Sequence, residues 1–264
     1  MLSLEHVSFR YPGTPGNSLH DASVELAEGS ITGLVGPAGG GKSTICLIAA
    51  GLAPRSTGGR AGGTMRIDGV AVPWSGLVGP EMVTLGLQDP AGQLSMVADT
   101  VYEEVAFGPS NLGLARPEMM DRTVAALELF GIEELAKRDP RRLSGGEQQL
   151  VVLAGLLAMQ PRHLVLDEPG AHLDASGTRR LVAALQAAAG EGTAILIAEQ
   201  RTDLLLGLCD SIAVVAAGNI VERGSPRAVL TDETVVALGV PEPPELRLER
   251  RLRDSVVRDV ETES

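Results

Sequence analysis

A chain of 264 residues is long enough for one large domain with an inserted subdomain, and its 44% hydrophobic and 21% charged residues exclude a disordered protein. Lysine and arginine total 22 against 34 for aspartate and glutamate, which gives a net charge of −12, and aromatic residues make up 2%. A negative chain with few aromatic side chains lacks the basic contacts and stacking surfaces that bind nucleic acids, so we expect no nucleic-acid partner.

Short apolar runs alternate with helical patterns along the chain, which predicts an α/β fold with a largely parallel central sheet. We expect strands at Leu4–Phe9, Ser23–Leu26, Ile31–Val35, Thr64–Ile67, Met82–Leu87, Leu164–Leu166, Ala194–Ala198 and Ile212–Val215. The first two strands and Thr64–Ile67 are expected to be antiparallel edges. From about 89 to 160 the pattern is helical, including Pro117–Phe130, where apolar residues recur at helical spacing at Met120, Val124, Leu127 and Phe130. This block is predicted to be a helical subdomain inserted into a domain of residues 1–240.

Two further segments are expected to lie outside the regular elements. The glycine-rich run at 58–63 lacks the Lys-Ser pair of a phosphate loop and is interpreted as a flexible connection. Prolines at 241, 243 and 244 introduce a charged C-terminal tail, 241–264. Leu248, Leu252, Val256 and Val260 are spaced by four residues, as in an amphipathic helix. So narrow an apolar stripe buries little surface, and a solvated tail is the favoured interpretation.

The cysteines and the apolar runs bear on location. Cys46 and Cys209 have no cysteine or histidine at metal-ligand spacing beside them, so we expect reduced thiols, with Cys46 a small core residue. The first residues lack the pattern of a secretory signal. Apolar runs such as Leu150–Met159 are shorter than the roughly 20 residues of a spanning helix. Any membrane role is therefore expected to depend on partner chains.

A phosphate-binding loop is predicted between the strand Ile31–Val35 and a following helix. The residues with this spacing are Gly36, Pro37, Ala38, Gly39, Gly40, Gly41, Lys42, Ser43 and Thr44. Glycines allow consecutive backbone N–H groups to surround phosphates at a helix N-terminus. Lys42 would contact the β- and γ-phosphates, Ser43 would bind Mg²⁺, and Thr44 would support the α-phosphate side.

Two adjacent carboxylates, Asp167 and Glu168, follow the apolar strand Leu164–Leu166. Asp167 is interpreted as an acceptor from Mg²⁺-bound water, and Glu168 as the general base for the attacking water. An exposed turn is the alternative for such a pair in isolation. It is disfavoured here because a parallel-sheet ATPase needs this strand beside its phosphate loop.

The string Leu-Ser-Gly-Gly-Glu-Gln-Gln at 143–149 precedes an apolar helix, Leu150–Ala158, and alone would be only a helix N-cap. Together with the two preceding motifs, it resembles the signature motif of the nucleotide-binding subunits of ABC transporters. The resemblance extends to about residue 235. It implies a P-loop ABC-type nucleotide-binding domain, with a mixed sheet, an antiparallel β edge and an inserted helical subdomain, that uses ATP and Mg²⁺.

The resemblance assigns further roles by position. Tyr11 matches the aromatic residue that stacks on adenine, and Gln88 matches the glutamine that contacts Mg²⁺ and the attacking water. Asp174 matches the aspartate of the D-loop at a dimer interface. The residues that bind the γ-phosphate held by the other subunit correspond to Ser144, Gly145 and Gly146. The family pattern therefore implies a head-to-tail dimer with a second ABC ATPase, either identical or homologous.

A narrower resemblance comes from the run at 99–113, which continues from Gln88-Asp89-Pro90 through Gln93. It is similar to the ATPases of energy-coupling factor (ECF) and cobalt-type importers of vitamins and transition-metal ions. In that group two ATPases, often nonidentical, drive an integral membrane coupling subunit near the glutamine loop. A separate membrane subunit binds the substrate. The resemblance implies a peripheral protein at the cytoplasmic face of the cell membrane.

The sequence departs from the family at Gln200, where a histidine usually contacts the γ-phosphate. A glutamine amide forms hydrogen bonds but cannot become cationic. Two alternatives stay open: a working, slower ATPase, or an ATP-switched dimerisation module with weak turnover. The intact Lys42, Glu168 and signature motif favour the first. The histidines that cannot be assigned the missing role are His6, His20, His163 and His172.

A soluble ABC ATPase of repair or assembly systems ranks last among the functions considered. Such proteins often carry long coiled coils or inserted metal sites. The sequence shows neither a sustained heptad pattern nor a zinc-ligand pattern.

Overall fold

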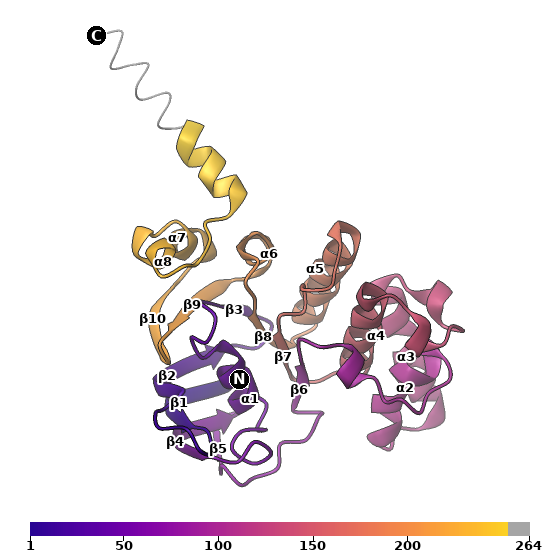
Figure 1. The fold of residues 1–264 in the computed structure, drawn as a ribbon. Coiled ribbons are helices and arrows are strands. Elements are labelled where there is room, and N and C mark those ends of the chain that lie inside the picture. Colours follow the sequence, from indigo (N-terminus) through magenta and orange to yellow (C-terminus); the bar gives the residue numbers. More distant parts are fainter. Residues whose placement is uncertain (253–264) are drawn as a thin grey trace.

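The chain folds around two β-sheets (Figure 1). The computed structural model describes residues 1–252. One sheet is antiparallel, with strand order β2-β1-β4-β5. Its strands are β1 (Leu2–Arg10), β2 (Leu19–Leu26), β4 (Arg60–Ile67) and β5 (Val70–Val72). The other sheet has the order β10-β9-β3-β8-β7-β6. Its strands are β3 (Ile31–Val35), β6 (Val83–Gly86), β7 (His163–Asp167), β8 (Ala194–Ala198), β9 (Ser211–Ala216) and β10 (Asn219–Gly224).

The larger sheet is parallel except at one edge, where β10 pairs antiparallel with β9. Strands β3, β7 and β8 are buried at every position, as expected where protein covers both faces. Their side chains alternate between two cores: Leu164 and Leu166 pack on one face of the sheet and Val165 packs on the other. The predicted mixed sheet with antiparallel strands beside it is confirmed.

Helices cover both faces of the larger sheet. Helix α1 (Lys42–Ala49) packs between the two sheets, where Ile45 and Ile48 are fully buried and Cys46 is the small core residue that was expected. On the other face lie α5 (Ala175–Gly190) and α6 (Thr202–Leu208). The two apolar cores, one on each face of the larger sheet, hold its strands in position and so determine where the strand ends lie.

A group of helices stands to one side of the sheet, between β6 and β7 in the chain (Figure 1). Its members are η1 (Ala91–Gln93), α2 (Val101–Asn111), α3 (Arg116–Phe130), η2 (Glu133–Leu135), η3 (Pro140–Arg142) and α4 (Gly145–Ala158). Thr100 begins α2 with a capping box, and Gly131 ends α3 in the left-handed region, at φ 60°. Helices α2, α3 and α4 pack together through an apolar interior that includes Phe130.

The burial of α3 differs from the predicted apolar stripe. Leu127 and Phe130 are buried, whereas Met120 and Val124 are each 43% exposed. Thr123 and Ala126 occupy the inner face instead. The prediction considered apolar residues alone and so assigned Met120 and Val124 to the buried face. Thr123 can be buried instead because its hydroxyl donates a hydrogen bond within the helix, to the Met119 carbonyl at 2.7 Å.

The glycine-rich run is not the flexible connection that was expected, because residues 60–63 belong to β4. Here β4 passes very close to β1 at an irregularity in their pairing. A Cβ on Gly63 would lie 2.3 Å from the His6 carbonyl oxygen, and Gly63 has a φ of +83°. Glycine is thus required by a close backbone approach within a sheet.

Strands β5 and β10 were not predicted. The first has three residues, and the second, Asn-Ile-Val-Glu-Arg-Gly, contains no sustained apolar run and lies at a sheet edge. Edge strands with polar residues carry little of the alternation on which strand prediction depends.

The start of the predicted tail packs on the domain, which corrects the expectation of a solvated segment. It follows α7 (Pro226–Leu230) and α8 (Glu233–Ala237), and the residues from 244 to 252 are helical. Leu246 is 2% exposed within the main core, and the Glu242 carboxylate, also buried, pairs with Arg250 at 2.8 Å. Leu248 and Leu252 are more than half exposed. Val256 and Val260 lie outside the described residues.

Among residues 1–252, none of the helices combines the length and the apolar character needed to cross a membrane.

Candidate active site

The predicted catalytic and phosphate-binding residues come together at the carboxyl ends of four parallel strands. The phosphate loop follows β3, Gln88 comes two residues after β6, Asp167 ends β7, and Gln200 comes two residues after β8. These strands are neighbours in the order β3-β8-β7-β6, so their ends lie along one edge of the sheet. Open α/β sheets bind ligands at this edge.

The phosphate loop is shaped by glycines that no other residue could replace without rearrangement. A Cβ on Gly36 would lie 2.0 Å from the Val215 carbonyl oxygen, and one on Gly40 would lie 2.6 Å from the same atom. Gly41, at φ 117°, precedes the first residue of α1 without a side-chain cap. The loop therefore lies tightly against β9, and the N-terminus of α1 is left without a capping side chain, which suits an anion.

Lys42 lies inside this loop and is 6% exposed. Its Nζ donates to the carbonyl oxygens of Gly36 at 2.8 Å and Pro37 at 3.1 Å. Burial lowers the pKa of Lys42, while the neighbouring carboxylates of Glu168 and Asp167 act in the opposite direction. The ammonium group is thus held beside the loop backbone and within the field of both carboxylates.

Tyr11 and Thr44 are joined at the side of the loop. Thr44 is buried, and its hydroxyl lies 3.3 Å from the Tyr11 hydroxyl. The Tyr11 ring makes an edge-to-face contact with Phe9, with ring centroids 4.7 Å apart. Tyr11 also lines a surface hollow of about 590 Å³ together with Arg10 and Arg60. An aromatic residue and two arginines therefore line this hollow, and the same tyrosine contacts Thr44 of the loop.

Asp167 is 8% exposed at the end of β7. Burial raises the pKa of its carboxyl group, and the nearby charge of Glu168 adds to this effect. A hydrogen bond with the Ser43 side chain and the charge of Lys42 oppose the rise in pKa. The side chain of Ser43 therefore lies near the buried carboxylate of Asp167.

Glu168 is held between two side-chain amides. Gln88 Nε2 donates to Glu168 Oε2 at 2.8 Å, and Gln200 Nε2 donates to Glu168 Oε1 at 2.6 Å. The glutamate backbone adopts a positive φ of 51°, and its N–H donates to the Ala198 carbonyl at the end of β8 at 2.8 Å. Both carboxylate oxygens are therefore oriented by residues from the two adjacent strands.

Glu199 is a residue of this region that the sequence analysis missed. It directly follows β8 and is 2% exposed. Burial raises the pKa of its carboxyl group against three backbone N–H donors, those of Arg201, Gln200 and Gly170. The available signal was a charged residue directly after the strand Ala194–Ala198, whose five residues are all apolar.

The residues of the signature motif and the D-loop form a separate site. Ser144 begins α4 with a capping box: its Oγ accepts from the Glu147 backbone N–H, and the Glu147 carboxylate accepts from the Ser144 backbone N–H at 2.8 Å. Asp174 caps α5 by accepting from the Gly177 N–H at 2.7 Å. A Cβ on Gly146 would lie 3.0 Å from the His172 carbonyl oxygen, so the two segments pass close together.

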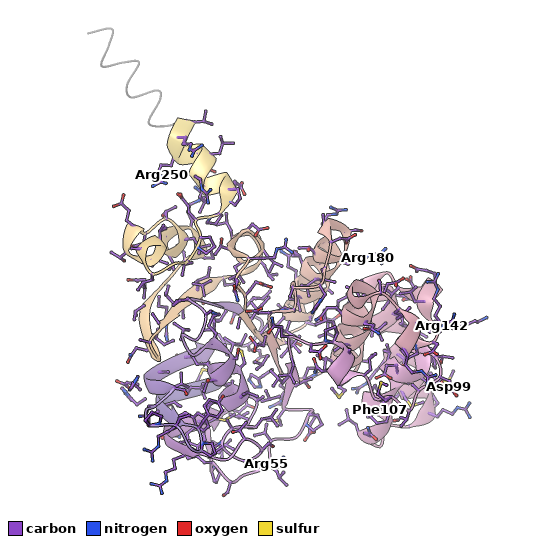
Figure 2. All side chains as sticks on the ribbon, in the orientation of Figure 1. Arg55, Asp99, Phe107, Arg142, Arg180 and Arg250 are labelled. Atoms are coloured by element: carbon purple, nitrogen blue, oxygen red, sulfur yellow. The ribbon has the colours of Figure 1, made fainter. Side chains whose placement is uncertain are left out.

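This second site is a hollow of about 400 Å³ whose lining includes Ser144, Gly146, His172, Asp174 and Arg180. None of the phosphate-loop residues contributes to it. Arg180, labelled in Figure 2, donates from α5 to the Gly131 carbonyl at 2.8 Å and so ties α5 to the end of α3. One chain thus carries two separated sets of the predicted ligand-binding residues.

Apolar side chains are exposed around the segment that follows Gln88. Leu87, Met96, Val97 and Phe107 are between 40% and 73% exposed. Figure 2 shows Phe107 on the lower edge of the helical group. Two side chains hold the backbone of this segment in place. The Gln93 side chain accepts a hydrogen bond from the Leu87 N–H at 2.7 Å, and the Glu104 carboxylate accepts one from the Ser95 N–H at 2.7 Å.

In the part of the chain that the structure describes, no three histidine, cysteine or acidic residues are grouped so as to hold a metal ion by themselves. The candidate Mg²⁺ ligands of the first site are a hydroxyl, a carboxylate and an amide, those of Ser43, Asp167 and Gln88. Mg²⁺ is commonly held by one or two carboxylates together with substrate phosphates, and this donor set suits such a site.

Comparison with known proteins agrees with the geometry. The family described as ABC transporter matches residues 19–171. The cobalt import ATP-binding protein CbiO of Rhodobacter capsulatus is 36% identical over 92% of this chain and 85% of its own length. The energy-coupling factor transporter ATP-binding protein EcfA2 of Streptococcus thermophilus is 34% identical over 94% and 90%, respectively.

Solved structures show the same fold. The structure of cbiO1 from Clostridium perfringens, described as part of the ABC transporter complex cbiONQ, matches with a TM-score of 0.73 at 29% identity, covering 89% of this chain and 92% of that one. A dimeric bacterial ABC transporter cassette matches with a TM-score of 0.74 at 21% identity and shares the fold. Sequence and fold together establish that this chain belongs to the ABC transporter family of ATP-binding proteins.

Proposed function

We propose that this ABC ATPase powers a membrane importer of the ECF type for a vitamin or a transition-metal ion. The observation that carries the enzymatic part is the Glu168 carboxylate, held between the amides of Gln88 and Gln200 beside Asp167 and the phosphate loop. The importer type is supported by 36% identity to a cobalt import protein and 34% identity to an energy-coupling factor protein.

The residues present fit ATP with Mg²⁺. The loop after β3 fits phosphates because it ends at the N-terminus of α1, which has no side-chain cap, and because Gly36, Gly39 and Gly41 adopt the positive φ angles of a tightly curved loop. Lys42 would contact the β- and γ-phosphates, and Tyr11 would stack on the adenine. Ser43, Asp167 and Gln88 would hold Mg²⁺, which neutralises phosphate charge when bound.

Glu168 is proposed as the general base. A carboxylate that accepts hydrogen bonds from two amides is held in one orientation, which is the condition for taking a proton from a water molecule. The Gln88 amide would also orient that water. The Gln200 amide would stand where the family has histidine and would donate a neutral hydrogen bond there.

The separation of the two sets of ligand-binding residues supports action as a dimer. Ser144, Gly145, Gly146 and Asp174 lie in or beside a hollow that contains none of the phosphate loop. They would complete the site of a second ABC ATPase, identical or homologous, by binding the γ-phosphate that it holds. ATP would then close the pair and hydrolysis would reopen it.

The exposed apolar residues after Gln88 support a membrane partner. Met96, Val97 and Phe107 present apolar surface next to the segment that begins at Gln88, on which the catalytic glutamate depends. We place the integral membrane coupling subunit here, with a separate membrane subunit that binds the substrate. The ATPase would be a peripheral protein at the cytoplasmic face of the cell membrane.

One observation favours a second candidate function, an ATP-switched dimerisation module with weak turnover. Gln200 cannot supply the positive charge of a histidine, although its amide reaches Glu168 at 2.6 Å. The module would bind ATP and dimerise with a rate of hydrolysis no higher than that of Glu168→Gln.

Affinity purification of the tagged chain from its native membranes in mild detergent, followed by mass spectrometry, tests the importer. Very hydrophobic small proteins and a second ATPase are expected in stoichiometric amounts. Recovery of soluble partners alone contradicts the importer. Phosphate release by the purified assembly, compared with its Glu168→Gln form, tests the enzyme, and equal rates favour the module.

A further inference from the structure

Glu199 is a buried glutamate for which the proposed function has no role. It is 2% exposed and directly follows β8. Burying a carboxylate is costly unless hydrogen bonds compensate for the lost water, so its position needs an explanation. The explanation lies in what its two oxygens contact.

The Glu199 carboxylate joins the loops that follow two neighbouring strands. Oε1 accepts from the backbone N–H of Gln200 at 2.9 Å and of Arg201 at 3.2 Å, in the loop after β8. Oε2 accepts from the Gly170 N–H at 3.1 Å, two residues beyond Glu168. One side chain therefore connects the segment that carries the general base to the segment that carries Gln200.

The backbone around Glu199 extends this connection to the phosphate loop. The Glu199 N–H donates at 3.1 Å to the Leu34 carbonyl, near the end of the strand that leads into that loop. The Glu168 N–H donates at 2.8 Å to the Ala198 carbonyl, the residue before Glu199. Gln200 is thus held at two points: its backbone by Glu199, and its side chain by Glu168.

The hydrogen bond from the Gly170 N–H to Glu199 Oε2 depends on glycine at position 170. A Cβ at this position would lie 2.7 Å from Glu199 Oε2, closer than real Cβ atoms approach. The absence of a side chain at 170 therefore lets the carboxylate reach the Gly170 N–H.

We propose that Glu199 is a positioning residue for ATP hydrolysis, which sets Glu168 and Gln200 at their working separation. The inference rests on the proposed ATPase function. All three groups that face the carboxylate are N–H donors, so an acceptor-only side chain is required. A glutamine of the same size would place its NH₂ against at least one of these donors and leave that N–H without an acceptor.

The test compares Glu199→Gln and Gly170→Ala with the wild-type full-length chain. Each variant disturbs the same contact, one from the side of the carboxylate and the other from the side of the loop. We expect kcat to fall by about 10- to 100-fold in both, as is typical when the support of a catalytic group is lost. KM and the affinity for ATP should stay within about twofold because the phosphate loop is unchanged.

Backbone amide exchange provides a readout that does not depend on turnover. In both variants, peptides that cover 168–174 and 199–204 should exchange faster, while the phosphate-loop peptide keeps its wild-type rate. Glu242→Gln is the matched control: it changes another buried glutamate, which pairs with Arg250 and has no described contact with Glu168, Gln200 or Gly170, and should leave kcat unchanged.

Three results would overturn the inference. One is a wild-type kcat in Glu199→Gln; another is unchanged exchange in both loops; the third is a parallel loss of ATP affinity, which would indicate general unfolding. If Glu199→Gln does not fold, Gly170→Ala decides by the same criteria. A wild-type chain that hydrolyses ATP no faster than Glu168→Gln refutes the ATPase proposal instead, and the exchange data then show only whether Glu199 anchors the loops.

Discussion

Replacement of Gln200 by alanine removes one of the two amides that orient the proposed base. The lost contact is the 2.6 Å hydrogen bond from Gln200 Nε2 to Glu168 Oε1. A hydrogen bond to a charged group contributes about 1.5–3 kcal/mol. Because Gln200 is exposed and water can replace the donor, we take the lower value, about 1.5 kcal/mol. If this contribution is expressed in the transition state, kcat falls roughly tenfold.

Phosphate release at saturating Mg-ATP, with a single-turnover experiment to isolate the chemical step, measures this effect. KM should change by less than about twofold because the described Gln200 side-chain bond is to Glu168. Gln186→Ala, which removes an exposed glutamine on α5, is the control. A wild-type rate in Gln200→Ala would refute the reasoning.

Gln200→His distinguishes a missing histidine from an adapted glutamine. A histidine at this position can donate a hydrogen bond and can also become cationic. We therefore expect the variant to preserve or raise hydrolysis in the same assay. A large loss would show that the site depends specifically on the amide.

Other predictions concern the loop, the helical group and pH. Gly36→Ala places a Cβ 2.0 Å from the Val215 carbonyl oxygen. It should lower the free energy of unfolding, measured by urea unfolding, by about 1–3 kcal/mol, and it should weaken ATP binding, measured by nucleotide titration. Unchanged values in both assays would contradict the loop geometry. Phe130→Ala should cost about 3–5 kcal/mol in the same unfolding assay, since the ring is fully buried, and a cost below 1 kcal/mol would argue against this packing. Burial lowers the pKa of His163, although its bond to the Met82 carbonyl opposes this, so the fold favours the neutral ring. The contribution of the neutral His163 ring to the free energy of unfolding is present above the unfolded pKa of about 6.5 and is lost as pH falls through the lower folded pKa. The decline in the free energy of unfolding on acidification should therefore be smaller in His163→Gln. An identical decline in both proteins would show that His163 does not cause it.

Many residues of the candidate active site could be proposed from the sequence because they belong to contiguous motifs at the ends of strands. The glycines at 36 and 39–41 with Lys42 predict a backbone that surrounds an anion, and the acidic pair at 167 and 168 follows an apolar strand. Each motif identifies its own strand end. Since parallel strands present their carboxyl ends at one edge, the folded sheet brings these motifs together there.

Contacts between distant segments were less predictable. The burial of Leu246 and the pairing of Glu242 with Arg250 join the predicted tail to the domain, although its proline-led and charged sequence is typical of a solvated segment. The glycine-rich run at 58–63 resembles a flexible linker in composition, yet the close approach of β1 requires glycine there. In both segments the deciding factor is a neighbour far away in the sequence.

By itself, the sequence predicted the α/β class, the phosphate loop and the acidic pair, because local spacing and backbone freedom are encoded by adjacent residues, and its motifs carried the resemblance to the ABC transporter family. Only the tertiary structure decided that Gln88 and Gln200 both donate to Glu168, and that the buried Glu199 joins the loops that carry Glu168 and Gln200. Such contacts depend on which strands are neighbours and on the space that a glycine leaves, and neither is a property of any one segment.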